Sequence, residues 1–81
     1  MDIKESELKD LIAGILKISA EDINDLSSPD SIDSWDSHAH LNLVLALESK
    51  FNISFDDDEV LELLSYKSIK KSLMTQNINF I

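Results

Sequence analysis

Apolar residues recur at helical spacing in two long segments of the chain. In residues 6–16 they are separated by 3, 1, 3 and 1 positions: Leu8, Leu11, Ile12, Ile15 and Leu16. In residues 37–51, at about 100° per residue, one face collects His40, Leu43, Val44, Leu47 and Phe51. Each pattern predicts an amphipathic helix that buries one face.

The C-terminal third predicts a short helix, then a longer one. Asp56-Asp57-Asp58-Glu59 places acids in a first turn, where the helix dipole favours them, and apolar residues follow: Val60, Leu61, Leu63 and Leu64. Ser65 or Ser68 is expected to cap the next helix. That helix would turn Tyr66, Ile69 and Leu73 inward and Lys67, Lys70 and Lys71 outward. Residues 76–81 are predicted to form a frayed tail.

Residues 17–36 separate the two long helical segments and contain Pro29 and several serines. A single helical turn is expected at Ser19-Ala20-Glu21-Asp22, and the rest is expected to be loop. A loop of this length is unusual in a small domain unless it packs down or has a function. Its expected anchors are Ile23, Leu26, Ile32 and Trp35.

These elements predict one all-α domain over residues 1–81. It is a small four-helix bundle with three main helices, one short helix, and a long loop between helices one and two. A chain this short buries only about 60% of its unfolded surface, so a deep active-site cavity is not expected. No apolar run approaches the roughly 20 residues of a membrane-spanning helix. The N-terminus shows no signal pattern, and we therefore expect a cytoplasmic protein.

Sixteen acids against seven lysines give the chain a net charge of −9. This charge would repel nucleic-acid phosphates and attract a partner with a basic patch. A merely soluble acidic surface explains the charge equally well. The chain has no cysteine, so it has no disulfide and no thiol of its own.

Ser37 lies where a polar approach meets the longest apolar-periodic segment, with Asp36 just before it. Asp or Ser at this position accepts hydrogen bonds from the unpaired N–H groups of a first helical turn. Backbone donors and the helix dipole also favour an added phosphate there. An accessible hydroxyl at Ser37 is therefore suited to carry a phosphodiester.

The stretch W-D-S-H-A-H-L-N-L-V-L-A-L-E (residues 35–48), followed two residues later by F-N-I-S-F-D-D-D-E (residues 51–59), resembles the acyl carrier protein family. In that family a D-S-L/M motif opens the second helix, and the resemblance extends over nearly the whole chain, to about Leu73. It implies that Ser37 carries 4'-phosphopantetheine, with Asp36 as part of the motif. It also implies a monomer whose partners are a phosphopantetheinyl transferase and acyl-loading and acyl-transfer enzymes with basic docking patches.

The outer face of the second helix is the expected docking surface. It carries His38, Asn42, Leu45 and Ser49, and the family uses the same stripe to meet its enzymes. Asp57, in the acidic third helix, is a further candidate. The chain departs from the family at three of these positions. His38 replaces the usual Leu or Met, and Asn42 and Ser49 stand where the family often carries acids. These departures favour a specialised acyl or polyketide-type pathway over primary fatty acid synthesis.

The same residues suggest functions other than that of an acyl carrier. His38 and His40 lie about 200° apart on a helix, so they do not share a metal ion, and we expect no metal site. Ser37, His40 and Asp36 match a catalytic triad only in composition, and we expect no enzyme activity. His40 is expected to be a partly buried histidine whose hydrogen bonds are satisfied. An aminoacyl or peptidyl carrier and an unmodified acidic helical adaptor remain as alternatives, and the cargo stays open.

Overall fold

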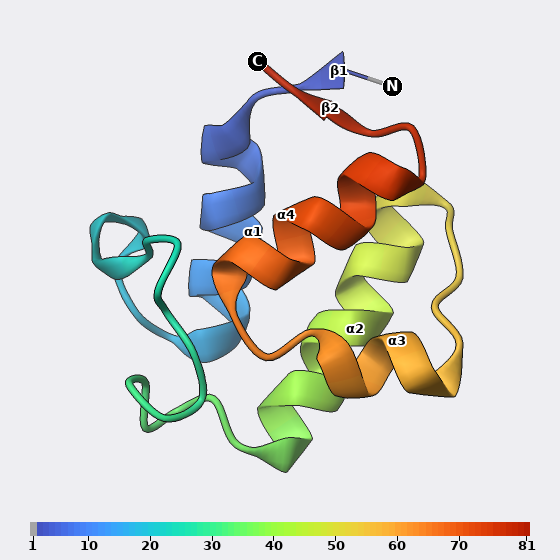
Figure 1. The fold of residues 1–81 in the computed structure, drawn as a ribbon. Helices are drawn as coiled ribbons and strands as arrows, with labels where there is room; N and C mark the ends of the chain where they lie inside the picture. Colours follow the sequence, from blue (N-terminus) through green and yellow to red (C-terminus); the bar gives the residue numbers. More distant parts are fainter. Residues whose placement is uncertain (1) are drawn as a thin grey trace.

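The computed structural model describes residues 2–81, and Met1, which the sequence places in the same domain, lies outside them. The elements in chain order are β1 (Asp2–Ile3), α1 (Glu5–Leu16), the 3₁₀ turn η1 (Ala20–Asp22), α2 (Ser37–Phe51), α3 (Asp57–Glu62), α4 (Tyr66–Thr75) and β2 (Asn79–Phe80). The described chain is mostly helical (Figure 1), so the expected small all-α bundle is confirmed. The short turn expected near Ser19 is also present, as η1.

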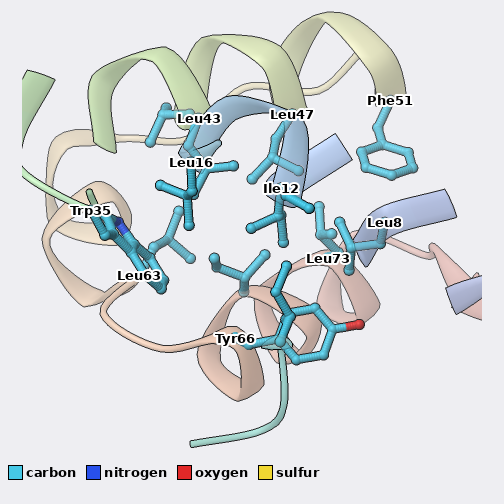
Figure 2. Packing of buried hydrophobic residues seen from close by; sticks show 14 of the residues in the cluster. Leu8, Ile12, Leu16, Trp35, Leu43, Leu47, Phe51, Leu63, Tyr66 and Leu73 are labelled. Carbon is cyan, nitrogen blue, oxygen red and sulfur yellow. The ribbon is translucent and has the colours of Figure 1, made fainter. Parts of the chain in front are cut away.

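One apolar core lies between α1, α2 and α4, and Figure 2 shows the side chains that meet there. α1 contributes Leu8, Ile12 and Leu16, and α2 contributes Leu43, Leu47 and Phe51. Leu63, Tyr66, Ile69 and Leu73 close the core from the C-terminal side. The buried faces of both long helices are therefore those that the apolar spacing predicts.

Short polar side chains fix where three helices begin. Asp36 caps α2 by accepting a hydrogen bond from the Ala39 N–H at 2.8 Å, and Asp56 caps α3 in the same way from Glu59. The Ser65 hydroxyl accepts from the Ser68 N–H at 3.1 Å and caps α4. Each cap satisfies an N–H group that has no partner within its own helix. Because these signals are local, the sequence places α2 at its observed bounds.

The C-terminal residues are ordered against the N-terminus, so the predicted frayed tail is wrong. β2 pairs in parallel with β1, with Asp2 opposite Asn79 and Ile3 opposite Phe80. Ile78 is only 2% exposed and belongs to the core. Figure 1 shows β1 and β2 side by side at one end of the bundle. Burial of Ile78 and pairing with β1 hold a segment whose own sequence gives no strong strand signal.

The loop between α1 and α2 packs down through fewer anchors than predicted. Ile23 and Trp35 are buried and Ile32 is half-buried, but Leu26 is 84% exposed, so its predicted role as an anchor is wrong. Ser27 is the residue of this turn that is buried. Its hydroxyl accepts from the Asn24 N–H at 2.9 Å, and the resulting tight turn leaves Leu26 on the outside.

Loop and helices meet in a polar cluster around Lys70. The Lys70 Nζ lies 3.0 Å from Asp25 and 3.3 Å from Glu5, and the Tyr66 hydroxyl donates to the same Glu5 carboxylate at 2.9 Å. The Tyr66 hydrogen bond and Lys70 lower the pKa of Glu5, and Lys70 lowers that of Asp25. Burial and the Glu5 contact raise the pKa of Tyr66. Lys70 is therefore half-buried and paired with two carboxylates. The sequence predicts instead that its side chain points outward.

Candidate functional site

Ser37 is the first residue of α2 and is exposed to solvent. The preceding Asp36 is held by its bond to the Ala39 N–H, which fixes the direction in which the chain enters the helix. Within residues 2–81, no hydrogen bond engages the Ser37 hydroxyl. Ser37 therefore presents an accessible hydroxyl oxygen at the N-terminal end of a 15-residue helix, where the backbone N–H groups favour negative charge.

An apolar hollow of about 540 Å³ opens directly beside Ser37. Residues from the loop, from the start of α2, from α3 and from the segment that follows α3 surround it. Its lining is Pro29, Trp35, Asp36, Ser37, His40, Leu41, Val60, Leu61 and Leu64. Leu41, Leu61 and Leu64 are 58%, 70% and 55% exposed, so the hollow beside the hydroxyl presents apolar surface to solvent. This group of leucines is the surface that the sequence analysis did not identify.

A weak signal for this surface was present in the sequence. Leu41 follows Ser37 by four residues, a spacing that places two helical side chains on the same face. Val60, Leu61, Leu63 and Leu64 crowd a helix of only six residues and the two positions after it. So short a helix cannot bury all four, and only Leu63 enters the core. The number of apolar residues in and just after α3 therefore indicates that some of its leucines are exposed.

His40 joins three elements at the back of the hollow. Its Nδ1 accepts a hydrogen bond from Trp35 Nε1–H at 3.0 Å, and its Nε2 lies 3.0 Å from the Val60 carbonyl oxygen. His40 is half-buried, and both of its ring nitrogens have partners, as predicted. Neither nitrogen is directed to Ser37 in this arrangement, so the nucleophile–base contact that a triad requires is not formed here.

The stripe predicted for docking faces outward. His38, Asn42, Leu45 and Ser49 are all exposed, with Leu45 at 63%, and Asp57 is exposed at the start of α3. His38 and Asn42 border a second hollow of about 340 Å³ between α2 and the end of α1. Asp36 lines both hollows. Ser37 thus stands between a polar stripe on one side and the leucine-lined hollow on the other.

Within residues 2–81 there is no group of three or more His, Cys, Asp or Glu side chains placed to hold a metal ion. None of the helices described for these residues is long and apolar enough to cross a membrane. Comparison of the sequence with protein-family models and with curated proteins gave no match. The residues around Ser37 are therefore the features of the molecule that indicate a function.

Proposed function

We propose that the protein is an acyl carrier, with 4'-phosphopantetheine attached to the Ser37 hydroxyl and acyl groups held as thioesters on that arm. The observation that carries the proposal is the exposed Ser37 hydroxyl at the start of α2, at the edge of an apolar hollow. The resemblance of the surrounding sequence to the acyl carrier protein family supports the same conclusion.

The residues around Ser37 fit a phosphodiester. The start of α2 offers backbone N–H groups and the positive end of a helix dipole, both of which stabilise a phosphate. Asp36 occupies the Ala39 N–H, so it fixes the geometry of the turn while the Ser37 oxygen remains accessible. The arm supplies the thiol that forms the thioester, and the protein itself has no cysteine.

The hollow and the outer stripe give this carrier two surfaces. Leu41, Leu61 and Leu64 provide apolar area next to the attachment point, suited to contact an apolar cargo or an apolar enzyme surface. The net charge of −9 favours enzymes with basic docking patches and disfavours nucleic acid. We place the protein in the cytoplasm as a monomer in a specialised acyl pathway, modified by a phosphopantetheinyl transferase.

The rival functions differ in measurable ways. An enzyme would use Ser37 as a nucleophile, but the nearby His40 is engaged by Trp35 and Val60. An unmodified adaptor would share the fold and the charge and would never gain mass. An aminoacyl or peptidyl carrier would gain the arm and differ only in the group that it accepts.

Loading with an acyl thioester tests the proposal. A broad-specificity phosphopantetheinyl transferase with acyl-coenzyme A should add one acyl-phosphopantetheine to the protein. Neutral hydroxylamine should then remove the acyl part alone, because it cleaves the thioester and leaves the phosphodiester. Intact-mass spectrometry follows both steps. If the protein gains no mass while a known carrier in the same tube is loaded, the adaptor is the better interpretation.

A docking role for the outer stripe is tested by Leu45→Asp. Leu45 is 63% exposed, so this change should leave thermal unfolding nearly unaltered. Loading by a cognate enzyme should slow at least about tenfold, because burying even a neutral polar group without a hydrogen-bond partner costs roughly 1–3 kcal/mol, and burying an ionised carboxylate costs more. Met74→Asp, the same kind of change at a 56% exposed residue of α4, is the matched control. Equal loading rates for the two variants would mean that the stripe is not part of the docking surface.

A further inference from the structure

The hydrogen bonds of His40 with Trp35 and Val60 form with only one protonation state of the imidazole. Indole Nε1–H is a donor and never an acceptor, so His40 Nδ1 must carry a lone pair to accept it at 3.0 Å. The Val60 carbonyl is an acceptor, so His40 Nε2 must carry the hydrogen. The neutral imidazole with its proton on Nε2 satisfies both contacts at once.

A second proton on His40 breaks one of the two contacts. It would sit on Nδ1 and point at the hydrogen of Trp35 Nε1, and two donors repel each other. The Val60 contact would survive, because Nε2 still donates. Trp35 is 3% exposed, so its indole N–H would be left without an acceptor and with little access to water. Protonation of His40 therefore breaks its hydrogen bond with Trp35 in the loop and keeps its hydrogen bond with Val60 in α3.

We propose that His40 is a positioning residue whose neutral form holds the loop before Ser37 in place and whose protonation releases it. Trp35 is separated from Ser37 only by Asp36, so movement of Trp35 alters the entry into α2. The Trp35 and His40 rings also stack, with centroids 6.2 Å apart and planes inclined by 26°. The effect on modification of Ser37 rests on the proposed carrier function, whereas the Trp35 contact does not.

Of the elements that contact His40, the loop that carries Trp35 also contains Asp30 and Asp33, and α3 ends at Glu62, and all three side chains are exposed. Asp36 is the other titratable side chain among the described residues that line the hollow, and its carboxylate is bonded to the Ala39 N–H. On α3, Asp56 caps the helix and Glu59 accepts from the Ser72 hydroxyl on α4, while Asp57 and Asp58 are exposed. On α2 itself, His38 is exposed. Of these side chains, histidine is the type that ordinarily changes charge between pH 5 and 8.

Composition makes this inference directly testable by fluorescence. Trp35 is the only tryptophan of the chain, and His38 and His40 are its only histidines. Trp35 emission is measured from pH 8 to pH 5 in wild type, His38→Gln and His40→Gln. Glutamine at position 40 keeps an acceptor for Trp35 and a donor for Val60 but cannot titrate.

The expected result is a one-proton change in Trp35 emission in wild type and in His38→Gln, with none in His40→Gln. Circular dichroism should show the helices intact over the same range. A flat wild-type curve, or an unchanged transition in His40→Gln, would overturn the inference. Nitrogen NMR of the wild-type His40 ring at pH 8 gives an independent test that needs no variant. The inference requires the tautomer protonated on Nε2, and the Nδ1-protonated tautomer would contradict it.

The link to Ser37 has its own readout. The rate of phosphopantetheinyl transfer to wild type, divided by the rate for His40→Gln, cancels the pH dependence of the transferase itself. This ratio should fall between pH 8 and pH 5.5, and a constant ratio would show that His40 does not act on Ser37. If neither protein is modified at any pH, the carrier proposal fails, and the fluorescence and NMR results still decide the role of His40.

Discussion

Replacing Ile78 by alanine should lower the free energy of unfolding by about 2–5 kcal/mol, the usual cost of truncating a buried isoleucine. Ile78 is 2% exposed and packs into the core just before β2. Total stability for 81 residues is roughly 4–12 kcal/mol, so a large part of it would be lost. Urea unfolding followed by circular dichroism measures the effect.

Ile81→Ala is the matched control for this prediction. Ile81 is 76% exposed, and its hydrogen bonds with Ile3 and Glu5 use backbone atoms, which alanine retains. Its substitution should change stability by less than about 0.5 kcal/mol. Equal and small effects for both variants would mean that the C-terminal residues are frayed in solution, as the sequence pattern suggests.

Ile78 is buried although the sequence predicts a frayed tail over residues 76–81, and this difference has a physical origin. α1 and α2 are predictable because their apolar residues follow the helical period, and α2 carries its own N-cap in Asp36. The strand at Asn79–Phe80 has two residues, and its partner lies at the other end of the chain. The β-propensity of so short a segment does not reveal that it pairs with a strand 77 positions away in the sequence.

Leu26 and Lys70 show the same limit. Hydrophobicity alone predicts Leu26 as an anchor and Lys70 as a solvated charge. The turn made by Asn24 and Ser27 leaves Leu26 outside, and Lys70 lies across to Asp25 and Glu5. The Lys70 contacts join segments that are distant in sequence, so a local pattern contains no information about them. The turn that exposes Leu26 is itself local, but the Tyr66 N–H holds it to α4 by donating to the Ser27 carbonyl at 2.9 Å, and hydrophobicity along the chain reveals neither contact.

In the candidate site, too, the sequence predicts the local features and misses those that join separate elements. Ser37 and Asp36 are found from sequence because a helix start has a local signature, and the structure places both there. The hollow requires α3 to come beside the start of α2, which no spacing within one helix reveals. The contact from Trp35 through His40 to Val60 likewise joins three separate elements.

The largest functional effect is expected at Ser37 itself. Replacing its hydroxyl by hydrogen in Ser37→Ala removes the attachment atom, so modification should be abolished. The fold should survive, because Ser37 is exposed and the cap of α2 is supplied by Asp36. Ser34, three residues earlier and also exposed, lies outside the helix and lacks the N–H groups of its first turn. Ser34→Ala should therefore react like wild type.

Intact-mass spectrometry after incubation with coenzyme A and a phosphopantetheinyl transferase tests the central claim most directly. Wild type and Ser34→Ala should each gain the mass of one phosphopantetheine, and Ser37→Ala should gain none. Modification of Ser37→Ala at the wild-type level, or no modification of the wild type beside a carrier that reacts, would contradict the assignment of Ser37 as the attachment site.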